Sequence, residues 1–247
     1  MFPTGDDRVP GKGLGLVTIL FIAINILVFV FLQGAGSNEA FTYGYAAVPL
    51  EITTGDDLTT PQAVETPQGP VEFPQAPGPN PIFLTLLTSM FMHGGWLHLI
   101  GNMVFLWVFG DNVEHAINRG FYIIFYLLAG VVAALAQILI NTDSPIPSLG
   151  ASGAVSGVLG AYLVLFPRNR VRVMIGFRQT LLPAIVVIGM WAVFQFINGA
   201  GAFAVSEQTT GGVAYMAHIG GFVFGLFAGA LARSAGAHEV GSRTAQS

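Results

Sequence analysis

The sequence predicts an all-α membrane protein, built as one bundle of six transmembrane helices with a long loop after the first helix. The first observation is composition, because 53% of the 247 residues are hydrophobic and only 9% are charged, against about 25% charged in typical soluble domains. The second is a set of six apolar runs close to the length of about 20 residues that crosses a bilayer. The third is that all nine Lys and Arg residues fall in alternate connections between those runs.

The six apolar runs are the expected membrane spans. They cover about Leu14–Leu32, Trp96–Phe109, Phe121–Ile140, Ala151–Phe166, Leu181–Ile197 and Val213–Leu231. The second is short and is expected to extend backwards through the apolar stretch Phe83–Met92, beyond a break at Gly94 and Gly95. The first follows Arg8 and Lys12, as a signal peptide would. Its apolar core exceeds the usual 7–15 residues of such a peptide, so we interpret it as a retained span.

The positions of the basic residues predict the orientation of the bundle. They lie before span one, between spans two and three, between spans four and five, and after span six. Cytoplasmic loops carry the excess of Lys and Arg, so both termini are expected to be cytoplasmic in a protein of the plasma membrane. Residues 1–13 then form a cytoplasmic N-tail, residues 14–233 the membrane domain, and residues 234–247 a cytoplasmic C-tail.

Residues 34–95 are expected to form a long, acidic, proline-rich loop on the outer side. Its acidic residues are Glu39, Glu51, Asp56, Asp57, Glu65 and Glu72. One interpretation is a solvated, partly flexible loop. The other is a cover that packs along the bilayer surface and shapes an active site. Phe41, Tyr43, Tyr45 and the apolar segment that ends at Met92 favour interfacial packing.

Several classes of function are excluded by what the chain lacks. It contains no cysteine, which excludes disulfides, thiolate metal sites and a cysteine nucleophile. It has no basic face suited to nucleic acid. No acidic residue falls within the six predicted spans, and Asp111 is expected just past the end of span two, so a pair of membrane-embedded catalytic aspartates is excluded. No His-Glu-x-x-His helix is present, which argues against a zinc protease.

Ser152 is the candidate nucleophile. Span four has about 16 residues, roughly 24 Å of helix, which is less than the hydrocarbon thickness of about 30 Å. With Arg168 and Arg170 at its cytoplasmic end, its outer end should start below the membrane surface and place Ser152 in a wet pocket. The free N–H groups of a first helical turn can stabilise an oxyanion. The alternative is that Gly150–Gly153 only allows close helix packing.

His218 is the candidate general base. It lies near the outer end of span six, and Gly221, Gly225 and Gly229 follow it on the same helical face. Span four offers a matching face of small residues, namely Gly153, Gly157, Gly160 and Ala161. Close packing of the two faces would bring Ser152 and His218 together, so that a neutral imidazole takes the hydroxyl proton. The alternative is an ordinary hydrogen-bonded interior histidine.

His98 and Asn102 are candidate oxyanion donors on span two. Their spacing of four residues places them on one helical face. The alternative is hydrogen bonding between helices. We expect a structural role for His93 and a packing role for Ser156. His115, His238, Asp143 and Glu207 lie in loops or the tail, so a Ser-His pair without an acid is favoured over a triad.

In combination, these motifs resemble the rhomboid family of intramembrane serine proteases, over about residues 41–231. The matching segments are Thr88–His93, His98–Asn102, Phe109–Gly110 with Glu114, Gly150–Gly153, and Ala217–Gly221 with Gly225.

The resemblance implies an activity and a set of roles. Ser152 would be the nucleophile and His218 the base, while His98, Asn102 and the Ser152 backbone N–H would form the oxyanion hole. The reaction would be hydrolysis of peptide bonds in or near transmembrane segments of membrane-protein substrates, with no metal or cofactor. Substrates would enter from the lipid bilayer beside span five, past Trp191, Phe194 and Gln195.

Two departures from the family pattern affect these expectations. The first outside loop has no arginine where many relatives carry a Trp-Arg pair, and Ser156 stands where others stack an aromatic ring on the histidine. The His218 ring must therefore be held by something else. The alternative function is a non-catalytic, rhomboid-like membrane chaperone or binding protein. Such relatives usually lack the serine or the histidine, and this chain has both. The sequence carries no signal for an oligomeric state.

Overall fold

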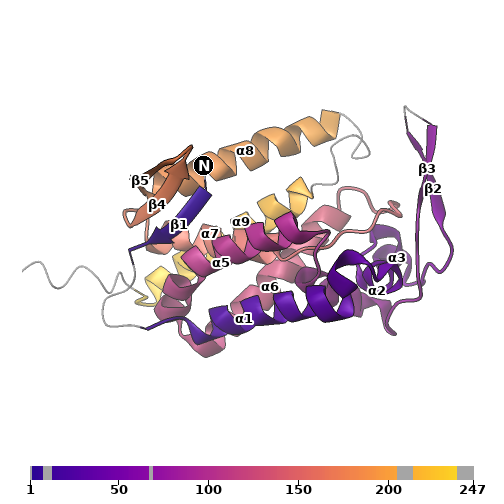
Figure 1. The fold of residues 1–247 in the computed structure, drawn as a ribbon, viewed down its shortest axis with the longest axis horizontal. Helices are drawn as coiled ribbons and strands as arrows, with labels where there is room; N and C mark the ends of the chain where they lie inside the picture. Colours follow the sequence, from indigo (N-terminus) through magenta and orange to yellow (C-terminus); the bar gives the residue numbers. More distant parts are fainter. Residues whose placement is uncertain (1, 8–12, 67–68, 205–213, 238–247) are drawn as a thin grey trace, which may run out of the picture.

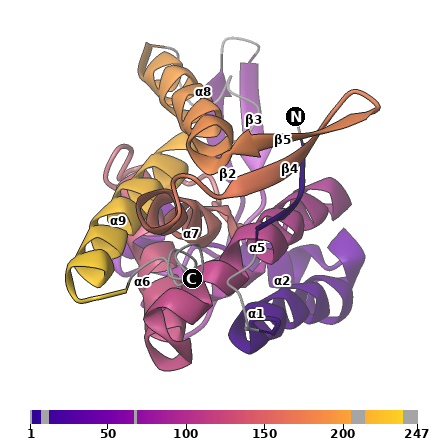
Figure 2. The ribbon, with the colours of Figure 1, turned by 90° about the vertical axis from the view of Figure 1, so that its left-hand side faces the viewer.

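The computed structural model describes residues 2–7, 13–66, 69–204 and 214–237. The fold is built on long apolar helices that run side by side along the molecule (Figure 1). They are α1 (Leu16–Leu27), continued by the π-helical turn η1 (Val28–Leu32), α5 (Trp96–Ile117), α6 (Arg119–Ile138), α7 (Ser152–Leu165), α8 (Ala184–Ala204) and α9 (Tyr215–Ser234). Seen from the end, α7 lies at the centre of the bundle (Figure 2). Glu207, His238 and most of the expected C-tail lie outside the described residues.

The helix bounds test the predicted spans. By length and composition, two described helices, α6 and α9, are long and apolar enough to cross a membrane. A third span is added if Ile82–Phe91 and α5, which meet at an angle of 78°, are counted as one bent span. The other apolar helices are shorter within the described residues. Six membrane crossings therefore stay a prediction, although each predicted run corresponds to one observed helix.

The helix that contains predicted span two is longer than the predicted span. The apolar run stops at Phe109, but α5 continues to Ile117, which places Asp111 and Glu114 inside the helix and buried. Glu114 is satisfied by the start of α1, because its carboxylate accepts hydrogen bonds from the backbone N–H groups of Val17, at 3.2 Å, and Thr18, at 2.9 Å. A helix N-terminus offers free N–H groups and favours negative charge, which is why a buried acid is tolerated here.

The fold is mostly helical, as predicted, but the described residues also form strands that the sequence analysis did not predict. A three-stranded antiparallel sheet in the order β1 (Phe2–Asp6), β4 (Arg170–Ile175), β5 (Arg178–Pro183) lies at the end of the bundle where α8 begins. The expected N-tail supplies its first strand. Leu181–Pro183 belong to β5 rather than to span five, because a residue before proline favours extended backbone.

Buried polar contacts hold the N-terminal strand in place. Asp6 accepts hydrogen bonds from the amide of Asn112 on α5, at 2.7 Å, and from the hydroxyl of Tyr162 on α7, at 2.5 Å. Burial raises the pKa of the Asp6 carboxyl to about 7, and the nearby Asp111 adds to the increase. Asp7 pairs with Arg170 at 3.0 Å. The N-terminus is thereby joined to the end of α7 opposite Ser152.

The described residues of the long first loop are folded. They form η2 (Gly34–Gly36), α2 (Glu39–Tyr45), α3 (Pro49–Thr54), the hairpin β2 (Gln62–Thr66) and β3 (Gly69–Phe73), η3 (Ile82–Leu84), α4 (Thr85–Thr88) and η4 (Ser89–Phe91). The hairpin projects away from the helices (Figure 1). The rest packs on the segment before α7, where Ala47 pairs with Ser148 and Leu50 N donates to Ser144 O at 3.0 Å. This arrangement fits the cover interpretation better than a solvated loop.

The predicted contact between the small faces of α7 and α9 is confirmed. A Cβ atom added at Gly221 would lie 2.1 Å from the carbonyl oxygen of Gly153, and one at Gly225 would lie 2.0 Å from that of Gly157. From the other side, a Cβ at Gly160 would lie 2.3 Å from the carbonyl oxygen of Phe222. The two backbones therefore touch directly, which is possible only without side chains at these positions.

Candidate active site

Ser152 lies at the first residue of α7. The preceding Gly150 has a φ of 137°, in the region that favours glycine, and its N–H donates to Ser89 O at 2.9 Å. A Cβ at Gly150 would lie 2.8 Å from the ring of His98. The chain therefore enters α7 through a tight turn that packs against the ring of His98. This turn places Ser152 on the same cavity as His98.

The structure brings Ser152 and His218 together. His218 Nε2 lies 2.8 Å from Ser152 Oγ, within hydrogen-bond distance. The two residues are 66 positions apart and lie near the same ends of α7 and α9. The glycine contacts between these helices place the two side chains, because direct backbone contact leaves little freedom for one helix to shift along the other.

The other ring nitrogen of His218 is bound by α8. Gln195 Oε1 lies 2.7 Å from His218 Nδ1, and Gln195 is 7% exposed. The rings of Trp191 and Tyr215 lie 6.3 and 6.4 Å from the imidazole, centroid to centroid. These contacts hold the ring in a site where Ser156 offers no aromatic surface.

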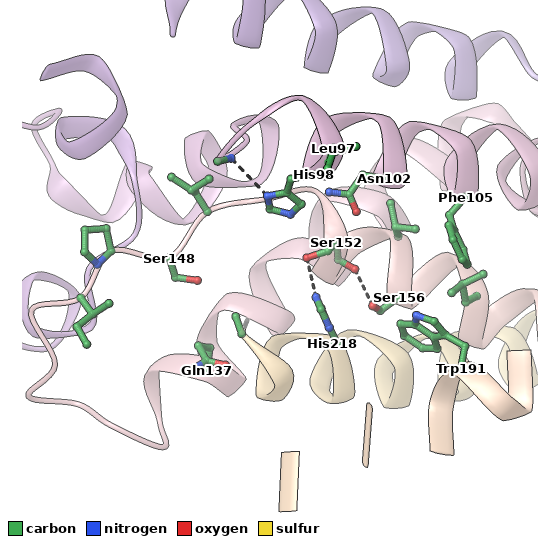
Figure 3. A pocket seen from close by; sticks show the side chains of 18 of the residues that line it. Leu97, His98, Asn102, Phe105, Gln137, Ser148, Ser152, Ser156, Trp191 and His218 are labelled. Carbon is green, nitrogen blue, oxygen red and sulfur yellow. Dashed lines mark hydrogen bonds between the residues drawn. The ribbon is translucent and has the colours of Figure 1, made fainter. Parts of the chain in front are cut away.

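His98 and Asn102 lie on α5 and face the cavity beside Ser152 (Figure 3). The N–H of Gly94 donates to His98 Nδ1 at 3.3 Å, which places the ring proton on Nε2, next to Gly150. Asn102 is 7% exposed, and its amide nitrogen has no hydrogen-bond partner within the described part of the chain. A buried donor of this kind is available to an oxyanion.

A cavity of about 620 Å³ joins these groups. It is lined by His98, Asn102 and Phe105 of α5, by Ser152 of α7, by His218 of α9 and by Trp191 of α8. Residues 146–149, in the segment that leads into α7, also line it. Figure 3 shows the serine, both histidines and the asparagine around this space. The contribution of residues 146–149 was missed by the sequence analysis, since only the fold places this segment along the cavity.

The remaining candidates lie as follows. Ser156 is buried and donates to Ser152 O at 2.6 Å. His93 is buried, its backbone N–H donates to Gln33 Oε1 at 2.8 Å, and its ring packs edge-on against His98. His115 was expected in a loop but lies in the last turn of α5, and Asp143 is exposed. No group of three or more histidine and acidic residues in the described ranges is arranged to hold a metal ion.

The three residues expected at the substrate entrance differ in position. Trp191 lines the cavity, Phe194 is 59% exposed on the outer surface of α8, and Gln195 points inward to His218. The spacing of four between Trp191 and Gln195 puts them on one face of α8. The sequence already contained a signal for the role of Gln195, because a polar amide within an apolar helix needs a hydrogen-bonding partner inside the protein. The entrance itself stays a prediction.

Fold and site together define a helical membrane protein with a hydrogen-bonded serine and histidine in an internal cavity. The family model of the Rhomboid domain matches residues 81–235. The chain belongs to the rhomboid family and is an integral membrane protein.

Sequence similarity to characterised rhomboid proteins supports this family assignment. Rhomboid protease GluP of Bacillus subtilis (strain 168) is 32% identical over 221 residues, 89% of this chain and 35% of that protein. The human presenilin-associated rhomboid-like protein, mitochondrial, is 28% identical, with 63% of this chain and 39% of that protein covered. Rhomboid protein 1, mitochondrial, of Saccharomyces cerevisiae is 29% identical, with 59% and 41% covered. The chain therefore spans less than half the length of these relatives.

Proposed function

We propose that the protein is an intramembrane serine endopeptidase that hydrolyses peptide bonds in or near transmembrane segments of membrane-protein substrates. The observation that carries the proposal is the 2.8 Å contact between Ser152 Oγ and His218 Nε2 at the edge of a cavity. A serine within hydrogen-bond reach of a base that a third group orients is the arrangement that activates a weak nucleophile.

The proposed reaction follows from these contacts. Ser152 Oγ attacks the substrate carbonyl while His218 Nε2 takes the hydroxyl proton. The oxyanion that forms is stabilised by the backbone N–H of Ser152, by His98 Nε2–H and by the amide of Asn102. His218 then gives the proton to the leaving amine, and a water molecule activated by the same base hydrolyses the acyl-enzyme. The proposal involves no metal or cofactor.

The proposal includes a place in the cell. The basic residues Arg170, Arg172 and Arg178 belong to the sheet at the end of α7 opposite Ser152. Because Lys and Arg concentrate on the cytoplasmic side, we propose that the sheet and both termini are cytoplasmic. The site then opens toward the outer side of the plasma membrane.

A covalent probe tests the proposal directly. We expect a fluorophosphonate to label the purified protein in lipid vesicles on Ser152 alone, because the dyad activates one hydroxyl. The same vesicles should cleave a reporter with a single transmembrane segment. Mass spectrometry locates the label, and gel analysis follows the reporter. An unlabelled Ser152 together with an intact reporter would favour the non-catalytic alternative.

Replacing Asn102 with alanine is expected to lower kcat for the reporter roughly 10²–10³-fold, about 2.7–4 kcal/mol, if its amide binds the oxyanion. KM and thermal stability should change little, since the amide nitrogen has no hydrogen-bond partner in the described structure. Asn198→Ala is the control, because that amide donates to Phe194 O within its own helix. An unchanged kcat would return Asn102 to a structural role.

A further inference from the structure

We propose that Gln195 is a positioning residue for the base, because its amide oxygen holds the proton of His218 on Nδ1. Since Gln195 belongs to α8 and His218 to α9, the orientation of the base depends on the docking of α8 against α9. The inference rests on the proposed function and adds a third member to the site. Unlike the usual third member of a serine protease site, this one is neutral.

The first argument is the geometry around one imidazole ring. Its two nitrogens lie 2.7 Å from Gln195 Oε1 and 2.8 Å from Ser152 Oγ. A neutral imidazole carries one N–H and one acceptor nitrogen. The amide oxygen only accepts, so it requires the proton on Nδ1. Nε2 is then left as the acceptor that faces the serine hydroxyl, which is the tautomer a general base needs.

The second argument is the setting of the amide. Gln195 is 7% exposed, while its neighbour Phe194 is 59% exposed. A polar side chain buried in an apolar helix is costly unless it is hydrogen-bonded, and the bond to His218 satisfies this one. Within the described structure, the His218 ring contacts Gln195, Ser152 and the rings of Trp191 and Tyr215. The amide therefore takes the place of a carboxylate, without a charge. His98 is the titratable side chain that shares the cavity with His218.

The third argument is the difference between the two helices that hold the ring. The contact of α9 with α7 is backbone against backbone and leaves little freedom. In contrast, α8 lies at the edge of the bundle (Figures 1 and 2) and exposes much of its apolar surface, including Met190, Val193 and Ile197 at 57–67%. Elements with few buried contacts open most easily. A displacement of α8 would break the bond of Gln195 and leave the pair of Ser152 and His218 without its orienting group.

The test compares an acceptor with a non-acceptor of similar size. In Gln195→Met we expect kcat for the reporter to fall at least tenfold, with KM within about twofold and a parallel loss in the rate of fluorophosphonate labelling, because orientation of the base is lost. Gln195→Glu keeps the acceptor, so it should retain most of kcat. Its carboxylate favours the imidazolium, so the acidic limb of the rate–pH profile should move to higher pH. Gln179→Met on β5 is the control.

Specific outcomes would overturn the inference. A folded Gln195→Met protein with the rate and pH profile of wild type would show that the amide does not position the base. A Gln195→Glu variant as slow as Gln195→Met, with an unmoved acidic limb, would reject the acceptor role. Thermal unfolding of both variants identifies a folding defect, and recovery of activity in Gln195→Glu argues against one. Failure of wild type itself to label would instead reject the proposed function.

A crosslink tests the dependence on α8. A Cβ at Gly199 would lie 3.5 Å from that of Tyr215, within the range for a disulfide, once the flexible ends of Met216 and Ile219, each 2.8 Å from it, move aside. The natural chain contains no cysteine that could compete. In Gly199→Cys/Tyr215→Cys, oxidation should hold α8 against α9. We expect the oxidised protein to label at Ser152 at least as fast as the reduced one. Slower labelling after oxidation would contradict the dependence, since docking is expected to maintain the base.

Discussion

Replacing Ser152 or His218 with alanine is expected to abolish cleavage of a reporter with a single transmembrane segment, lowering turnover by about 10⁴-fold or more. Ser152→Ala removes the atom that forms the acyl-enzyme, and His218→Ala removes the base 2.8 Å from it. Groups that act as one unit lose nearly everything when either is removed, so the double variant should be no worse than each single one. Reporter cleavage in vesicles with matched protein amounts is the measurement.

Ser156→Ala provides the matched control for this experiment. Ser156 lies one turn further along α7 and lines the same cavity, but its hydroxyl donates to the backbone of Ser152 rather than to His218. We expect this variant to cleave the reporter and to be labelled by the probe. Normal cleavage by a folded Ser152→Ala or His218→Ala protein would reject the dyad.

Replacing Gly225 with alanine is expected to destabilise the protein by about 3 kcal/mol or more, the upper end of what overpacking costs. The added Cβ would lie 2.0 Å from the carbonyl oxygen of Gly157, and that neighbour is backbone, which cannot rotate away as a side chain can. α7 and α9 would have to separate, so His218 would also move away from Ser152. The measurements are the midpoint of unfolding in detergent, the amount of protein in membranes, and the rate of probe labelling.

Gly189→Ala on α8 controls for the loss of a helical glycine. A Cβ there would meet no atom within 4 Å, so alanine should be neutral or slightly stabilising, because glycine is a weak helix former. Equal stability of the Gly225→Ala and wild-type proteins would show that the two helices can part without loss.

Local composition was enough to predict the helices and their packing faces. Each apolar run depends only on neighbouring residues, and the observed α6, Arg119–Ile138, lies within two residues of its predicted bounds. The glycines of α9 repeat with the helical period, so the face that meets α7 was predicted before the contact was seen. Ser152 and His218 were singled out because polar groups at the ends of apolar helices need partners.

Long-range contacts explain what the sequence analysis did not predict. Glu114 lies past the predicted end of span two, yet the start of α1, 96 residues away, satisfies its carboxylate. The strand at Phe2–Asp6 forms only because β4 lies beside it. Gln195 was assigned to the substrate entrance by resemblance, and its bond to His218 follows from the way α8 lies against α9.

By itself, the sequence determined that this is a helical membrane protein. It also determined that two of its apolar helices have a face of small residues, and that a serine lies near the end of one and a histidine near the end of the other. Those features follow from residue type and spacing along one helix at a time. Only the tertiary structure decided which nitrogen of His218 meets Ser152, which amide holds the other, and which donors share the cavity. The reason is that hydrogen bonds act over about 3 Å, a distance that helices far apart in the chain reach only after they have packed.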